Sequence, residues 1–132
     1  MTQHEITKAA PLLDASGNLT EPGWARSLLP VYCRSQIRAP KTRIKEWDYY
    51  CITDGHIGLA LTIADNGYMG LDSISFLNFD ERFEITKSPM RLLPMGKTHL
   101  PESSRLGASE IAASGYALAF YHEDGARQLS FH

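Results

Sequence analysis

The sequence has no long hydrophobic run. No window of the 132-residue chain approaches the roughly 18 to 20 consecutive apolar residues that a membrane-spanning helix needs. Its first residues, MTQHEITKAAPLLDASGNL, lack the positively charged region and the apolar run of a signal peptide. These two absences predict a cytoplasmic protein without a membrane span.

Cysteine is scarce and histidine is scattered. Cys33 and Cys51 are the only cysteines, and two reduced thiols are favoured over a disulfide between them, which stays an alternative. No HxH, HExxH or CxxC spacing occurs, and the five histidines are His4, His56, His99, His122 and His132. Because such spacings usually mark a metal site in a sequence, we expect no metal ion and no cofactor.

The net charge and the absence of two motifs argue against further classes of protein. A formal net charge of −2 gives no long-range attraction to nucleic acid or to an anionic membrane. The basic residues between Arg34 and Lys45 lie near Tyr32 and Trp47, a pattern that can bind single-stranded nucleic acid. Acidic residues follow at once, so a solvated or ion-paired face is favoured and no nucleic-acid partner is expected. The chain also lacks a GxSxG elbow and a phosphate-binding Gly-rich loop.

The length predicts one domain with an irregular N-terminal arm. A chain of 132 residues is long enough to bury a real core and short enough to be a single domain. Residues 1–42 are interrupted by turn and breaker signals such as Pro22-Gly23 and Pro40. Several apolar residues lie between these signals, so the arm is predicted to pack across a sheet formed by residues 43–132.

Two glycine dipeptides mark hairpin turns within residues 43–79. Asp54-Gly55 and Asn66-Gly67 each separate runs of alternating or apolar residues. Such dipeptides favour a type I′ turn, because its two central residues both need positive φ. We therefore expect three consecutive antiparallel strands joined by two-residue turns.

Further strands follow at turn-marked spacing. No segment keeps a 3.6-residue apolar period for three turns, which argues against long helices. The expected strands are residues 82–87, 90–93, 107–112, 116–122 and 126–131. Together these features predict an all-β fold, an antiparallel meander forming a barrel or half-barrel of about eight strands. The last strand runs almost to His132, so either it lies at an edge, where it could pair with a second copy, or the chain is the front part of a larger β-protein.

The predicted turns fix which side chains share a face. With two-residue turns, Tyr50 lies opposite Leu59, and Asp48 and Asp72 lie on either side of Leu61. The other face places large aromatic residues such as Trp47 over small residues, which is good packing. The first face is mostly aliphatic and carries Ile44, Glu46, Asp48, Tyr50, Ile52, Ile57, Leu59, Leu61, Ile63, Tyr68, Asp72, Ile74 and Phe76.

Three carboxylates on this apolar face, those of Glu46, Asp48 and Asp72, are candidate catalytic groups. Burial raises the pKa of an unpaired carboxyl, so such a group can exchange protons at neutral pH. One alternative is that the acids pair with Arg43, Lys45 or arginines of the arm and have a structural role. A second alternative is a one-residue slip of register, which would move every acid to the opposite face.

Several segments together resemble a known family. They are PGWARSLLPVYCRSQI, RIKEWDYYCIT and TIADNGYMGLDSISFLNFD, together with LPESS at residues 100–104 and the closing strand after Gly125. Over most of its length from about residue 5 the chain is similar to the opening part of bacterial proteins of the domain of unknown function 2804 family. The resemblance carries over no catalytic residues.

The resemblance also implies features of fold and length. Members of that family are distantly similar to lipocalin-like two-barrel proteins, which include carotenoid hydratases and tocopherol cyclases. Typical members are much longer, so a second β-module would normally follow this segment.

Three functions are compatible with these observations. The leading hypothesis is a binding module for a small apolar ligand, lipid-like or isoprenoid-like, with a site formed by Tyr50, Leu59, Leu61, Tyr68 and Trp47. An alternative is an acid/base enzyme of the hydratase, cyclase or isomerase type that uses Asp48, Asp72 or Glu46. The third is an interaction module that self-associates as a homo-oligomer through its last strand.

Overall fold

The computed structural model describes residues 3–123 and 125–132. The chain divides into two compact units, residues 1–39 and 40–132. In the described part of the chain, no helix is long and apolar enough to cross a membrane.

The N-terminal unit contains little regular structure. Its two short strands, β1 (Ala10–Pro11) and β2 (Pro30–Val31), pair in parallel, and a single 3-10 turn, η1, covers Arg34–Gln36. Asp14 stabilises one turn, since its Oδ1 accepts hydrogen bonds from the backbone N–H groups of Ser16 and Asn18. The predicted irregular character of this segment is therefore observed, while its packing across the sheet stays a prediction.

The second unit contains two antiparallel sheets. A second 3-10 turn, η2 (Lys41–Arg43), precedes them. The larger sheet has the order β3-β4-β5-β6, with the short strand β7 also paired to β5. Its strands are β3 (Glu46–Thr53), β4 (Ile57–Asp65), β5 (Met69–Asn78), β6 (Phe83–Lys87) and β7 (Met90–Leu92).

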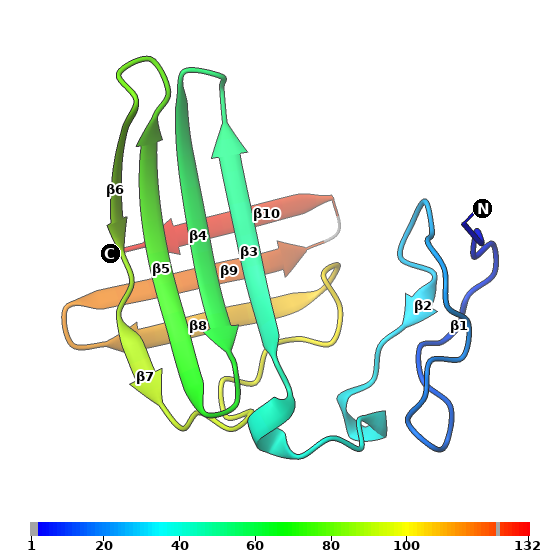
Figure 1. Ribbon diagram of the computed structural model, residues 1–132. Helices are drawn as coiled ribbons and strands as arrows, with labels where there is room; N and C mark the ends of the chain where they lie inside the picture. Colours follow the sequence, from blue (N-terminus) through cyan, green and yellow to red (C-terminus); the bar gives the residue numbers. More distant parts are fainter. Residues whose placement is uncertain (1–2, 124) are drawn as a thin grey trace. The chain divides into compact units, whose positions relative to one another are not determined.

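The smaller sheet has three strands in the order β8-β9-β10. They are β8 (Gly107–Ala113), β9 (Tyr116–Glu123) and β10 (Ala126–Phe131). Figure 1 shows them crossing the strands of the larger sheet at a steep angle. β10 lies at an edge of its sheet, which was one of the two alternatives considered, and self-association through that edge stays a prediction.

The all-β antiparallel prediction is confirmed, whereas no closed barrel is found among the described strands. The two sheets are separated by residues 93–106, which connect β7 to β8. Within this connection Leu93, Met95 and His99 have positive φ, and Pro94 and Pro101 lack an N–H group. Such a segment cannot continue a β-ladder, because prolines donate no ladder hydrogen bond and left-handed residues break the extended backbone.

The predicted positions of both hairpin turns are wrong by one residue. The N–H of Asp54 donates a hydrogen bond to the carbonyl of Ile57, so Gly55 and His56 are the central residues of the first turn. The second turn repeats this arrangement, with a 2.8 Å bond from the Asn66 N–H to the Met69 carbonyl. The glycine is thus the first central residue of each turn, with φ of +95° at Gly55 and +77° at Gly67.

This shift changes the register by two residues and leaves the faces intact. Tyr50 lies opposite Leu61 rather than Leu59, and Asp48 and Asp72 lie on either side of Ile63 rather than Leu61. Because side chains alternate with a period of two, a two-residue change keeps the side chains of β3 to β5 on their predicted faces, whereas Ile44 and Tyr68 lie outside these strands. The alternative of a one-residue slip is therefore wrong.

The core lies between the two sheets. Leu61 and Ile63 from β4 pack against Leu118 and Phe120 from β9, and Leu100 from the β7–β8 connection completes this cluster. All five side chains are buried. The face of the larger sheet that carries Leu61 is called the inner face from here on, and the opposite face is called the outer face.

Candidate functional site

The inner face continues beyond the core as a row of apolar side chains. Ile52, Leu59, Phe76 and Ile85 are cross-strand neighbours on β3, β4, β5 and β6. We call these four residues the open row. Ile52 is 53% exposed, Phe76 39% and Ile85 49%, while Leu59 is half-buried and packs against the core. The side chains of the row are apolar, as in a core layer, but three of the four are exposed, as on a surface.

The row is exposed because the smaller sheet ends at its edge strand, β10, and covers only part of the inner face. Along β3, Asp48 bonds to Ser109 on β8, and Tyr50 bonds to His122 on β9. Two residues along a strand advance about 6.6 Å, and neighbouring strands are about 4.8 Å apart. Each such step along β3 therefore meets about one more strand of the crossing sheet. The next step, at Ile52, reaches the level of β10, the edge strand.

Tyr50 marks the boundary between the covered core and the open row. Its hydroxyl lies 2.5 Å from Nε2 of His122, and its ring packs edge-on against Phe120 with centroids 5.2 Å apart. Burial raises the pKa of Tyr50, and the nearby charge of Asp48 raises it further, while Arg127 acts in the opposite direction. His122 is only 3% exposed, and its Nδ1 atom has no hydrogen-bond partner among the described residues.

Arg127, which is on the edge strand β10, lies close to Tyr50 of β3. It is the cross-strand neighbour of His122, and its guanidinium donates hydrogen bonds to the backbone carbonyls of Ser104, Ala126 and Glu123. Among residues 3–123 and 125–132, no carboxylate forms an ion pair with it. Within the described residues, the boundary of the core thus carries a guanidinium without an ion-pair partner, with the carboxylate of Asp48 also acting on Tyr50.

Asp48 and Asp72 are separated by Ile63 and have different surroundings. Asp48 is half-buried and accepts a hydrogen bond from the hydroxyl of Ser109, itself only 1% exposed. Asp72 is fully buried and binds Arg91 through both oxygens, at 2.7 and 2.9 Å. The two acids flank one strand, so their backbones are about 9 to 10 Å apart. The structure therefore does not join them in one catalytic pair.

The surroundings of Asp72 are those of a structural ion pair. The hydroxyl of Tyr116 donates a third hydrogen bond to this carboxylate, at 2.8 Å, and Arg91 also bonds to Thr98 and to the Ala64 carbonyl. The bond to Asp72 raises the pKa of Arg91, and burial together with this carboxylate raises the pKa of Tyr116. The network joins β7, β9 and the β7–β8 connection to β5, so Asp72 contributes to the fold.

A further buried acid, Asp65, was not among the acids predicted from the sequence. Its carboxylate accepts hydrogen bonds from the backbone N–H groups of Gly67, Gly96 and Thr98 and from the Thr98 hydroxyl. Burial raises the pKa of Asp65, and these hydrogen bonds outweigh that effect, so the pKa is lowered overall. Glu46 is half-buried and lies opposite Asp65 at the start of β3. Both acids lie away from the open row.

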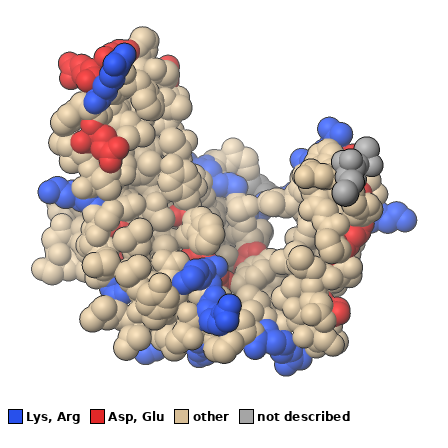
Figure 2. Space-filling view, in the orientation of Figure 1, with Lys and Arg blue, Asp and Glu red and all other residues tan. Residues whose placement is uncertain are grey.

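The predicted ligand-binding residues do not form one group. Tyr50, Leu59 and Leu61 lie together on the inner face, and Leu61 is fully buried in the core. Trp47 is 61% exposed on the outer face. Tyr68 lies in the β4–β5 turn, where Nζ of Lys45 sits 4.6 Å from the centre of its ring. Figure 2 shows that the surface over β3 to β5 carries few charged side chains, whereas charges gather near the β5–β6 turn.

Three residues of the site were not identified from the sequence: Ser109, His122 and Arg127. The alternation of β9 indicates that His122 shares a face with Leu118 and Phe120. The hairpin between β9 and β10 then places Arg127 beside it. What the sequence did not show is that this face packs against Tyr50, because that contact joins residues 72 positions apart.

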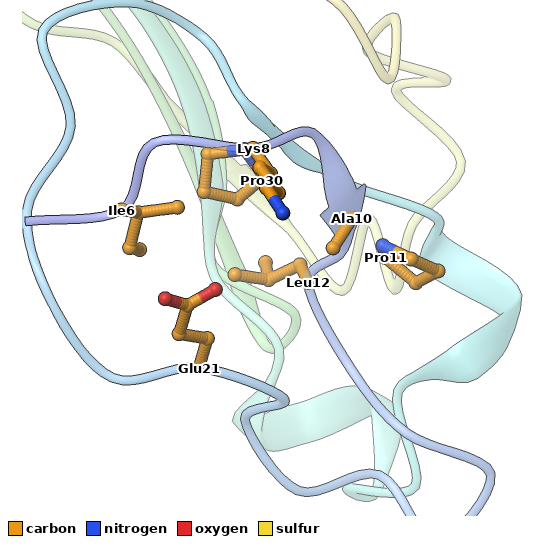
Figure 3. A pocket seen from close by; sticks show the side chains of 7 residues that line it. All are labelled: Ile6, Lys8, Ala10, Pro11, Leu12, Glu21 and Pro30. Carbon is orange, nitrogen blue, oxygen red and sulfur yellow. The ribbon is translucent and has the colours of Figure 1, made fainter.

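Two hollows elsewhere in the described chain are small. One in the N-terminal unit has a volume of about 10 Å³, the room of a single water molecule, and is shown in Figure 3. It is lined by Ile6, Lys8, Ala10, Pro11, Leu12, Glu21 and Pro30. A second, of about 150 Å³, lies at the ends of β9 and β10, below the few hundred Å³ usual for ligand pockets. The described residues contain no group of three His, Cys, Asp or Glu side chains able to hold a metal ion.

Comparison with known proteins identifies the family. The model of the family described as Domain of unknown function (DUF2804) matches residues 3–132, and the chain therefore belongs to this family. No curated protein and no solved structure matches the chain.

Proposed function

We propose that this member of the DUF2804 family binds a small apolar ligand on the open row. The observation that carries the proposal is the exposure of Ile52, Phe76 and Ile85 on the same face as the buried Leu61. Exposed apolar side chains that continue a core layer are typical of a surface that a ligand or a partner covers. In this interpretation the two crossing sheets are a half-barrel whose uncovered side is the open row.

The size of the row favours a ligand of modest affinity. Complete burial of a side chain of this kind contributes roughly 1.5 to 3 kcal/mol, so covering four partly exposed ones contributes roughly 3 to 5 kcal/mol. Association consumes several kcal/mol for lost translational and rotational freedom. Further contacts are therefore needed for tight binding, and the polar groups at Tyr50 are close enough to provide them.

A neutral fluorescent probe, N-phenyl-1-naphthylamine, tests the proposal directly. Ile52→Ser and Ile85→Ser should each weaken binding roughly fivefold, because each removes about 1 kcal/mol of apolar contact. Tyr49→Ser is the matched control, since Tyr49 is 55% exposed on the same strand as Ile52 but on the outer face. Probe binding that is absent, or that falls equally in the control, would contradict the proposal.

The second candidate function is acid/base catalysis at Asp48. The favouring observation is that Asp48 lies next to Tyr50 on the inner face, held by the hydroxyl of a buried serine. Asp72 is less suited to this role, because Arg91 and Tyr116 occupy its oxygens. A carboxyl carbon chemical shift of Asp48 that titrates as in a model peptide would argue against a catalytic acid.

A further inference from the structure

The polar groups at the inner end of the open row include the donor Arg127 and one acid, Asp48, both close enough to Tyr50 to act on its pKa. Arg127 donates only, and no carboxylate of the described residues forms an ion pair with it. Lys87 adds a second cation on the inner face of β6, where it is the cross-strand neighbour of Ile74 and has no ion pair in the described chain. The carboxylate of Asp48 accepts a hydrogen bond from the hydroxyl of Ser109.

The hydroxyl of Tyr50 is also assigned as a free donor. His122 is buried and its Nδ1 has no hydrogen-bond partner among the described residues. A buried N–H without an acceptor is rarer and costlier than a buried acceptor without a donor. We therefore assign the neutral tautomer of His122 in which Nδ1 carries no proton. The Nε2–H then donates a hydrogen bond to the hydroxyl oxygen of Tyr50, at 2.5 Å. The proton of the Tyr50 hydroxyl is then available to a ligand.

The geometry points to an amphiphilic carboxylate as the ligand, with its apolar chain on the open row and its carboxylate on Arg127 and Tyr50. This inference rests on the proposed function and adds the chemical class of the head group. A carboxylate is an acceptor-only anion, so it matches a guanidinium and a hydroxyl donor at once. Tyr50 precedes Ile52 by two positions on the same face, which places head and chain sites side by side.

The alternative role of Arg127 is purely structural. Its bonds to three backbone carbonyls would brace the β9–β10 turn and the segment at Ser104 without any ligand. The two roles differ in what they predict for a charged and an uncharged ligand with the same chain. If Arg127 has only a structural role, its replacement should change the affinity for both ligands equally. If it binds the head group, its replacement should weaken the binding of the charged ligand alone.

The test compares decanoate with decan-1-ol by isothermal titration calorimetry on the full chain. The intact protein should bind decanoate roughly tenfold or more tightly than the alcohol, as expected for charge-assisted hydrogen bonds. Arg127→Gln should remove this preference while leaving the affinity for the alcohol unchanged. Arg105→Gln, which removes the same charge from an exposed residue of the β7–β8 connection, should keep it.

A second variant covers the case in which Arg127→Gln does not fold. Tyr50→Phe keeps the ring contact with Phe120 and removes only the hydroxyl, so it should reduce the preference for decanoate several-fold. Equal affinities for the two ligands in the intact protein would overturn the head-group inference and leave the proposed function standing. Failure of both ligands to bind would overturn the proposed function as well.

Discussion

At the scale of single residues, the inner face separates acids that build the fold from groups that meet the open row. Asp72 and Asp65 are buried and fully hydrogen-bonded, as charged groups in an interior must be. Tyr50 and Arg127 lie at the boundary of the core instead, where donor groups remain available. The difference follows from position along the strands and not from residue type.

Asp65 provides a prediction of pH dependence. Its folded pKa lies below the ordinary value of 3.8, so its stabilising contribution is present above that value and is lost as the pH falls through the folded pKa. Asp65→Asn should therefore lower the free energy of unfolding at neutral pH, and the deficit should shrink in acid. Urea unfolding at several pH values measures this. Asp80→Asn, which removes an exposed acid, is the control, and a deficit independent of pH would contradict the assignment.

At the scale of elements, the two hairpin turns share a glycine at their first central position but differ in their surroundings. A Cβ atom added at Gly55 would meet nothing within 4 Å. At Gly67 it would collide with the Lys41 carbonyl oxygen and lie 3.0 Å from Cα of Thr42. The backbone of η2 therefore leaves no room for a side chain at the second turn.

The two turns form a matched pair for mutation. Both glycines have positive φ, so replacement by alanine at either should cost roughly 1 kcal/mol through backbone strain. Gly67→Ala should cost clearly more than Gly55→Ala, because a collision with backbone cannot be relieved by a side-chain rotation. Chemical denaturation of the two variants measures the difference. Equal losses of stability would show that the contact with η2 does not constrain the turn.

The turns also show how far the sequence determined the fold. Asp54-Gly55 and Asn66-Gly67 correctly identified three antiparallel strands and their faces. They did not identify which two residues are central, because one glycine at the first central position satisfies the turn as well as a type I′ pair does. Since the resulting error in register was two residues, the inner face was predicted correctly despite it.

At the scale of the whole molecule, the sequence indicated which side chains share a face of a sheet but not which faces pack against each other. One alternative paired Asp48 with nearby cations such as Arg43 or Lys45, whereas its observed partner, Ser109, is 61 positions away. The partner of Asp72, Arg91, was equally unforeseen. Alternation assigns a side chain to a face within one sheet. The packing of one sheet on another depends on the whole chain, and the lipocalin-like relationship inferred from the resemblance stays a prediction for the same reason.

The division of the chain into residues 1–39 and 40–132 leads to a prediction about folding. The core cluster lies wholly within residues 40–132, while a segment of about 40 residues seldom folds without disulfides, metals or a partner. A fragment of residues 40–132 should therefore unfold cooperatively in urea, and a peptide of residues 1–39 should show no cooperative transition. If the arm packs across the sheet, as the sequence predicts, the full chain should also be more stable than the fragment. A fragment without a cooperative transition would show that the core depends on the arm.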